Sequence, residues 1–317
     1  MTTIGVEFEL CSSYNIRDLV KILQERGIDI YYVDPKQPTS TYWKAEKDYS
    51  VICSGKDRFG KTLNTIEKTK ASKKKIQYFP IELVSPVLTN MKVLKSFLNH
   101  LHKLPPSYKI NQTQGFHVHI SNSHLQLPKF ETNGFGVQWV AAFCVNWTAF
   151  ERFILSKHHP VRMKSPHSRS LMSNLLYKNR MEDFNSLNVN DKTLSFSFIN
   201  DLFNPRRNDF GSGKVYPKGQ YHDINVSHGR NSVVNLSNLR NKNNRKGTIE
   251  IRSHEGTVDI VKILNHIKTV KALFKNAYNR KTKTFIDVRH IILDKYKKPF
   301  QKCSIQELES VFNQFVL

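Results

Sequence analysis

Two glutamates near the start of the chain are two residues apart in a strand-like segment, so their carboxylates would lie side by side. In "IGVEFELCSS", residues 4–13, Glu7 and Glu9 alternate with apolar residues. Side chains at positions i and i+2 of a strand point to the same face, about 7 Å apart. Two carboxylates held in this way repel each other, so at least one pKa rises unless a cation lies between them. Taken alone, such a pair is more often the solvent-exposed face of an edge strand, so its interpretation depends on what the other strands carry.

Ionisable residues interrupt three further strand-like segments in the same way. They are Glu82 in "IELVSP", His117 and His119 in "GFHVHIS", and Glu250, Arg252 and His254 in "TIEIRSHEGT". Taken singly, such a histidine is more often structural and such a glutamate more often lies on the surface. Together, each with apolar residues at the alternate positions, they predict a sheet with one core face and one polar cleft.

The residue types indicate which ligands this cleft would bind. Converging carboxylates bind hard divalent cations such as Mg²⁺ or Mn²⁺, and an imidazole can complete a site. A pair of such ions neutralises triphosphate oxygens and orients a transferring phosphoryl group. Arg252 adds a planar guanidinium that matches phosphate. Since the chain contains neither GxxxxGK[ST] nor GxGxxG, we expect a metal–triphosphate site without a P-loop.

The elements that position these residues follow from periodicity and capping signals. Strands are predicted at about 3–10, at 77–88, and in "DIYYV", "STYWKAEKDYSVI", "QGFHVHISNSH", "YHDINVSH", "SVVNLSNL" and "GTIEIRSHEGT". Helices are predicted after Asn15 and ending at Gly27, after Asn90, over 134–158 and from about 259 onward. No repeat or long linker divides the chain. We expect one α+β domain over 1–317, with a Lys-rich loop at about 55–76 and an irregular basic insert at about 159–220.

Composition limits the class of protein more than its function. The net charge of +23 would attract polyanions, nucleic acid included, but it is spread along the chain as in a solvated Lys-rich surface. Cys11, Cys53, Cys144 and Cys303 lack pairing or CxxC spacing, so we expect buried reduced thiols. No apolar run approaches a membrane span, and no signal-peptide pattern is found. A cytoplasmic protein without a membrane partner is predicted.

Five blocks in order resemble the putative amidoligase family of the glutamine-synthetase-like carboxylate–amine ligase superfamily. They are "GVEFEL", "YWKAEKDYSV", "IELVSPVL", "GFHVHIS" and "GTIEIRSHEGTVD". The resemblance implies a curved antiparallel sheet of the glutamine synthetase type, with helices packed on the convex face and ATP and two or more Mg²⁺ (or Mn²⁺) ions on the concave face. It also implies the reaction: a carboxylate attacks the γ-phosphate of ATP to give an acyl phosphate, and an amine displaces phosphate to form an amide.

The resemblance also assigns roles to residues that match the blocks. Glu7 and Glu9 would each face a different ion, and Glu82 would join Glu9. His117 and Glu250 would join Glu7 around the ion that bridges the ATP phosphates. Arg252 would stabilise the transferring phosphate, and His119 would contact the nucleotide. His254 and Glu255 fall in the last block, near the cofactor.

The substrate side matches the family less well. Asp48 and Ser50 resemble a "D-x-S" block that would line the substrate, but Tyr49 stands where the family usually has glycine. Lys44 and Lys47 nearby could hold an anionic carboxylate. The substrates implied are a carboxylate and an amine, with a peptide or protein as the candidate acceptor of an isopeptide-like bond.

Two other functions remain open on the sequence. Acids, an HxH pair and a basic surface would also suit a two-metal nuclease or phosphohydrolase acting on nucleic acid. A binding protein that keeps the fold without catalysis is the other alternative, although the full set of ionisable residues argues against it. A Ser or Cys nucleophile is disfavoured, because GxSxG is absent and no cysteine stands in a motif beside a histidine.

Overall fold

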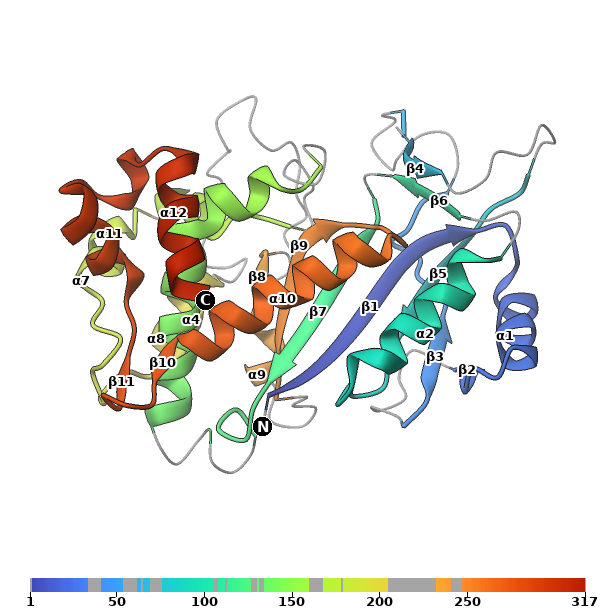
Figure 1. Cartoon of the computed structure of the whole chain (residues 1–317), viewed down its shortest axis with the longest axis horizontal. Helices are drawn as coiled ribbons and strands as arrows, with labels where there is room; N and C mark the ends of the chain where they lie inside the picture. Colours follow the sequence, from blue (N-terminus) through green and yellow to red (C-terminus); the bar gives the residue numbers. More distant parts are fainter. Residues whose placement is uncertain are drawn as a thin grey trace, which may run out of the picture. The chain divides into compact units, whose positions relative to one another are not determined.

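The computed structural model shows two compact units, which we describe separately (Figure 1). Residues 2–33, 41–53, 62–63, 65–68, 76–104, 108–111, 113–126, 130, 134–159, 168–177, 179–204, 232–240 and 247–316 are described. The strand unit comprises Thr3–His119 and Ser253–Lys268. The helical unit comprises Met1–Thr2, Ile120–Arg252 and Thr269–Leu317.

The strand unit is built on a mostly antiparallel sheet. Its strands are β1 (Thr3–Ser12), β2 (Ile30–Tyr32), β3 (Trp43–Glu46), β4 (Thr65–Lys68), β5 (Phe79–Val84), β6 (Tyr108–Asn111) and the first part of β7 (Gly115–Ser121), with the last part of β9 (Ile249–Glu255). Their order is β2-β3-β5-β1-β7-β9, and β6 pairs with β1 and β4. Only β2 and β3 among the pairs with a described register run parallel. The predicted mixed α+β class with an antiparallel sheet is confirmed.

One face of this sheet is apolar and is covered by helices. The helices are α1 (Ile16–Glu25), α2 (Met91–His102) and the start of α10 (Ile260–Asn276). Phe8 on β1 contacts Trp43, Phe97 and Phe116, and the rings of Trp43 and Phe97 stack at 3.6 Å between centroids. Figure 1 shows α2 lying across these strands. The residues that alternate with this core on β1 therefore face the other side of the sheet.

Capping signals in the sequence fix where α1 and α2 begin. The Asn15 side chain accepts hydrogen bonds from the backbone N–H groups of Arg17 and Asp18, and Asn90 caps α2 through Lys92. Gly27 ends the first helical segment with φ of +79°, a left-handed conformation that glycine adopts without a steric penalty. Both predicted caps are confirmed.

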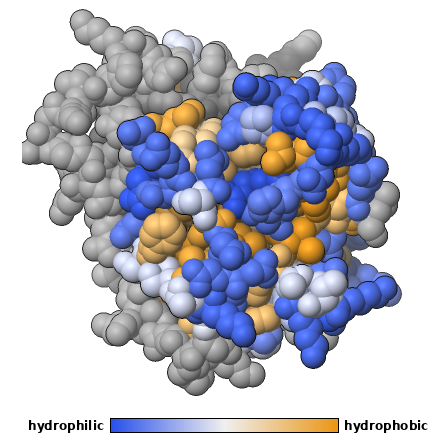
Figure 2. Space-filling model, turned by 90° about the vertical axis from the view of Figure 1, so that its left-hand side faces the viewer, coloured by the Kyte–Doolittle hydropathy of each residue, from blue (hydrophilic) through white to orange (hydrophobic). Residues whose placement is uncertain are grey.

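The helical unit packs around one long buried helix, α4 (Gly134–Ser156). Its other helices are α6 (Leu171–Tyr177), α7 (Met181–Ser186), α8 (Phe196–Phe203), α9 (Ser237–Arg240), α11 (Val288–Tyr296), η3 (Phe300–Lys302) and α12 (Ile305–Val316), and its short strands are β8 (Val234–Asn235), β10 (Tyr278–Asn279) and β11 (Thr284–Phe285). Phe150 and Phe153 of α4 pack on Phe312 of α12. Figure 2 looks onto the side that carries α7 and α11, where hydrophilic residues surround smaller apolar patches.

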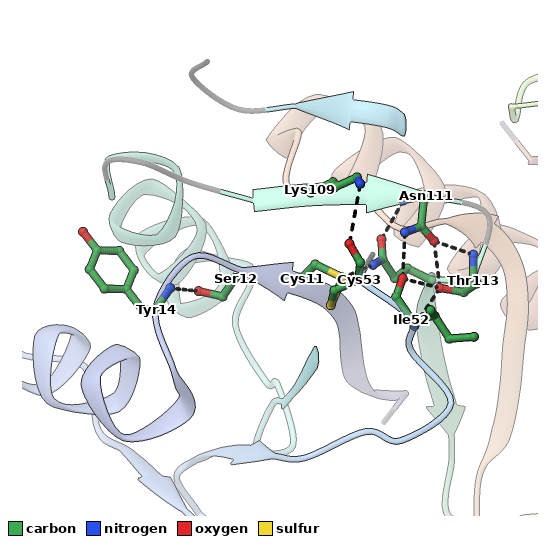
Figure 3. Close-up of a disulfide and its surroundings, with 9 residues drawn as sticks. Cys11, Ser12, Tyr14, Ile52, Cys53, Lys109, Asn111 and Thr113 are labelled. Carbon is green, nitrogen blue, oxygen red and sulfur yellow. Dashed lines mark hydrogen bonds between the residues drawn. A yellow bond between two sulfur atoms is a disulfide. The ribbon is translucent and has the colours of Figure 1, made fainter. Parts of the chain in front are cut away.

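The cysteine prediction is wrong for one pair. Cys11 and Cys53 form a disulfide, with a Cα–Cα distance of 5.5 Å and a sequence separation of 42 residues (Figure 3). The pairing is created by tertiary structure, since the end of β1 and the segment after β3 come together only in the fold. Cys144 and Cys303 are buried and unpaired, as expected.

Three segment predictions need correction. The expected irregular insert at 159–220 contains the helices α6, α7 and α8 in its described part. The expected Lys-rich loop at 55–76 contains β4, which pairs with β6. The expected strand "SVVNLSNL" is a two-residue strand followed by α9. The strand predicted in "YHDINVSH", 221–228, lies outside the described residues. Among the described helices, none is long and apolar enough to cross a membrane.

Candidate functional site

Carboxylates from three neighbouring strands line up on the polar face of the strand unit. In the β1–β5 register Glu9 lies opposite Glu82, and in the β3–β5 register Glu46 lies opposite the same residue. Adjacent strands are about 4.8 Å apart, and like charges directly opposite one another destabilise a sheet. The repulsion within this row of three glutamates is therefore relieved either by a compensating positive charge or by a proton on one of them.

Two histidines of β7 complete the polar face beside Glu7 and Glu9. The Nδ1 atom of His117 lies 3.4 Å from Glu7 Oε2, and its Nε2 atom lies 3.6 Å from Glu9 Oε1. His119 Nε2 lies 2.9 Å from Glu7 Oε1. Glu9 Oε2 also accepts a hydrogen bond of 2.6 Å from the backbone N–H of Gly115. These contacts orient both carboxylates of the ExE pair.

Two sets of ligand atoms in the strand unit have the spacing of a metal site. Glu7, Glu82 and His117 each place one donor atom within 4.8 Å of the others, and so do Glu9, Asp48 and Glu82. Carboxylate oxygens with one imidazole are the donors that Mg²⁺ and Mn²⁺ accept. Because Glu82 belongs to both sets, the two sets are adjacent.

Electrostatics favour the same interpretation of this face. Burial raises the pKa of Glu82 well above its usual range, and the negative charges of Glu7, Glu9, Asp48 and Glu46 raise it further. Lys44, buried on β3 with its Nζ atom 4.0 Å from Glu46 Oε1, supplies one compensating charge. If bound metal keeps Glu82 ionised, five carboxylates less one ammonium leave four negative charges, which two divalent cations would neutralise. The residues present thus fit a pair of such ions.

The expected substrate-side residues lie on a turn directly after β3. The backbone N–H of Ser50 donates to Asp48 Oδ1 at 2.8 Å, so Asp48 shapes the turn. Ser50 and Lys47 are exposed, and Tyr49 is 86% exposed. Asp48 itself lies with the ligand atoms of Glu9 and Glu82. Its geometry therefore indicates a metal-side role in addition to the expected substrate side.

Glu250 and Arg252 belong to the helical unit, where they contact each other. The Arg252 guanidinium donates to Glu250 Oε1, and the Asn235 side chain donates to Glu250 Oε2 at 2.6 Å. The β8–β9 pairing sets Asn235 opposite Glu250. Arg252 is thus held by a buried acid that is itself fixed from a second strand.

His254 and Glu255 lie at the end of β9, in the strand unit. The Nδ1 atom of His254 lies 2.7 Å from the backbone oxygen of Glu255, and its ring packs edge-on against Phe116 and His266. Both residues are buried. The His254 ring thus packs on the core side of the sheet, and Glu255 Oε2 lies 3.6 Å from His254 Nδ1.

Sequence reasoning missed Glu46 and the disulfide beside the acids. The signal for Glu46 was present, because Lys44 and Glu46 alternate with Trp43 and Ala45 in "WKAE". No comparable sequence signal exists for the Cys11–Cys53 pair, whose residues are far apart in the chain.

One comparison with known proteins gives a result. A family model described as putative amidoligase enzyme matches residues 1–274. No curated protein and no solved structure matches the chain.

Proposed function

The chain belongs to the putative amidoligase enzyme family, and from this premise we propose that it is an ATP-dependent carboxylate–amine ligase. The proposed reaction forms an amide or isopeptide-like bond through an acyl phosphate. A peptide or protein is the proposed substrate class.

The adjacent ligand sets around Glu82 are the observation that carries the proposal. Glu7 and His117 would hold one Mg²⁺ or Mn²⁺ ion, and Glu9 with Asp48 would hold the other, with Glu82 between them. When bound, such ions neutralise triphosphate oxygens and orient the phosphoryl group. A site with five carboxylates would otherwise repel ATP.

The remaining residues receive roles from their chemistry. Arg252, oriented by Glu250, would offset the negative charge that develops on the transferring phosphoryl group. His119, fixed by Glu7, would contact the nucleotide. A substrate carboxylate oxygen attacks the γ-phosphorus and ADP leaves. The amine then attacks the acyl carbon, phosphate leaves, and the nitrogen loses a proton.

The test is a thermal-shift titration with Mg²⁺ and a non-hydrolysable ATP analogue. A ligand at 100 times its Kd stabilises the native state by about 2.7 kcal/mol, which gives a readable shift. We expect the ATP analogue to shift wild type only when the metal is present, and by more than the metal shifts it alone. Glu9→Gln should not shift, whereas Glu25→Gln, which changes an exposed residue of α1, should behave as wild type.

The opposite pattern would overturn the proposal. A shift with metal that the analogue does not increase, accompanied by cleavage of nucleic acid without ATP, would identify a two-metal nuclease. A shift with Mg²⁺ and the analogue that Glu9→Gln retains would remove Glu9 from the site.

A further inference from the structure

The Cys11–Cys53 disulfide lies in line with the acids of β1. Cys11 follows Glu7 and Glu9 at the same two-residue spacing, so the three side chains share one face of the strand. Cys53 lies five positions after Asp48 in the sequence. The disulfide thus joins the strand that carries Glu9 to the segment that carries Asp48.

Hydrogen bonds fix the segment around Cys53 on the same side of the sheet (Figure 3). The backbone N–H of Ile52 donates to Thr113 Oγ1 at 3.1 Å, and the Asn111 side chain donates to the Ile52 oxygen at 2.8 Å. Val51 and Cys53 are buried with Cys11, and Tyr78 packs against them. The chain from Val51 to Cys53 is therefore clamped against β1 and β6.

The turn before β7 connects the disulfide to Glu9 by a second route. The Gln114 side chain donates to Cys11 Sγ at 2.7 Å, and the next residue, Gly115, donates its N–H to Glu9 Oε2. Gln114 Oε1 also accepts from the N–H of Asn111 at 2.7 Å. The Gln114–Gly115 turn therefore contacts both Cys11 and the metal-ligand candidate Glu9. The second cysteine of the disulfide, Cys53, is five positions from the candidate Asp48 in the sequence.

Asp48 depends on this clamp more than the other acids do. Glu7, Glu9 and Glu82 stand inside strands whose ladders hold them, whereas Asp48 stands on a turn after β3 ends at Glu46. Its carboxylate also makes the turn, through the N–H of Ser50. Directly after the turn, the described residues that hold the chain are Val51, Ile52 and Cys53.

We propose that the Cys11–Cys53 disulfide is a positioning device that holds Asp48 among the metal ligands, so that metal affinity depends on the thiol–disulfide state. The inference rests on the proposed metal site. Reduction by a dithiol breaks the Sγ–Sγ bond: the dithiol gives up two electrons and two protons and becomes a disulfide, and Cys11 and Cys53 become thiols. The turn then loses its covalent tie to β1.

The test measures Mn²⁺ affinity in both redox states, with and without Asp48. Oxidised protein and protein reduced with a dithiol, which is then removed anaerobically, are titrated with Mn²⁺ while free Mn²⁺ is followed by electron paramagnetic resonance. We expect reduction to weaken binding by about 10-fold, the usual effect of removing an outer-shell support. Asp48→Asn should weaken the oxidised protein similarly, and its reduction should cause no further loss.

Controls separate this role from a purely structural one. The Cys144→Ser/Cys303→Ser variant keeps the disulfide and should retain the redox effect. Cys11→Ser/Cys53→Ser should match reduced wild type, and where that variant fails to fold, chemical reduction supplies the comparison. Thiol titration of the denatured oxidised protein should count two thiols.

Three results would overturn the inference. They are a count of four thiols, an affinity unchanged by reduction, or a reduction effect as large in Asp48→Asn as in wild type. A failure of oxidised wild type to bind Mn²⁺ at all is distinct from these results, because it would remove the proposed metal site itself.

Discussion

Glu82 is a metal-ligand candidate whose negative charge would lower the stability of the fold. It lies opposite a glutamate on each neighbouring strand, and burial and these charges raise its pKa. The metal-free folded state therefore binds a proton at Glu82 more tightly than the unfolded chain does. The free energy of unfolding should fall as pH rises from the unfolded pKa toward the raised folded pKa.

This conflict predicts opposite effects of Glu82→Gln on stability and on ligand binding. The metal-free variant should be more stable than wild type at pH 8, by roughly 1 kcal/mol, the size of a cross-strand charge effect. The gain should shrink at pH 5, and Mn²⁺ affinity should be lost. Urea unfolding in a chelator at both pH values checks this, with Glu25→Gln as the matched surface control. An equal loss of stability at both pH values would contradict it.

At the residue scale, the sequence predicted four of the ionisable residues that the structure brings together on the polar face. Alternation within strands was enough to put Glu7, Glu9, Glu82 and His117 on one polar face, because period two is a local property. The metal-side position of Asp48 could not be predicted in the same way. It stands on a turn, where no periodicity relates side-chain direction to sequence position, and only tertiary contacts bring it to Glu82.

At the scale of elements, Gly256 allows the chain directly after β9 to approach the turn before β7 closely. A Cβ atom there would lie 2.9 Å from Gln114 Cβ and 3.2 Å from the backbone oxygen of Glu9. Gly256 N–H also donates to the Gln114 oxygen at 3.2 Å. The position therefore needs a glycine for close approach rather than for an unusual φ.

Gly256→Ala should disturb stability and metal binding together. The extra methyl group overpacks the contact, which typically costs about 1–3 kcal/mol, and it pushes on the backbone of a metal-ligand candidate. We expect a lower melting temperature and weaker Mn²⁺ binding. Gly5→Ala is the matched control on β1, because its nearest contact would be an ordinary 3.6 Å. Equal effects of the two substitutions would contradict the argument.

In the helical unit, Glu151 of α4 links two elements through a buried carboxylate. It accepts hydrogen bonds from the N–H groups of Leu171 and Met172 and from the Ser170 hydroxyl, at the start of α6. Burial raises its pKa despite these bonds. The folded state thus favours the protonated form, so the stabilising contribution of this residue decreases as pH rises through the raised pKa.

Glu151→Gln should therefore be most damaging at acidic pH. The amide places donors toward N–H groups, and the missing hydrogen bond costs about 1–3 kcal/mol. Because wild type is penalised for ionisation at neutral pH and the variant is not, the difference in unfolding free energy should be smaller at pH 7.5 than at pH 4.5. Urea unfolding checks this, with exposed Asp294→Asn as control. A difference that grows with pH would refute the assignment.

Helices and strands with a strong hydrophobic periodicity were predicted from the sequence, whereas short elements with a weak periodicity were not. The long apolar run of α4 and the alternation of β1 and β7 carry enough local signal. The short helices α6, α7 and α8 lie in a Ser-, Asn- and Arg-rich stretch. Helices α6 and α8 pack against α4, and α7 packs against α6. Tertiary packing, rather than propensity, decides such segments.

At the scale of the whole molecule, the net charge of +23 acts over distances longer than any single contact. Three of the positive charges are clustered in the turn between β10 and β11, on Arg280, Lys281 and Lys283. All three side chains are exposed, and none forms an ion pair with a described residue. This turn follows residue 274, where the family match ends. Tyr278 and Phe285 fix the hairpin by packing on Phe135.

This arrangement predicts that substitutions in the β10–β11 turn weaken binding to duplex DNA without changing the binding of Mg²⁺ and the ATP analogue. Arg280→Gln/Lys281→Gln/Lys283→Gln should weaken binding to duplex DNA at low salt. The slope of log K against log salt should fall by up to about 2.7, since each phosphate that a cation neutralises contributes about 0.9. The shift with Mg²⁺ and the ATP analogue should stay unchanged. Fluorescence anisotropy across salt concentrations measures the first effect, and the thermal-shift assay measures the second.

Lys92, Lys95 and Lys103 in and after α2 are also exposed and provide a matched triple variant of equal charge change. If binding depended on total charge alone, both triples would lower the slope equally. A larger effect of the β10–β11 turn would mean that the hairpin presents its cations as a local contact surface. A loss of the Mg²⁺–nucleotide shift in the hairpin variant would instead make these residues part of ATP binding, contrary to a site built on the polar face of the strand unit.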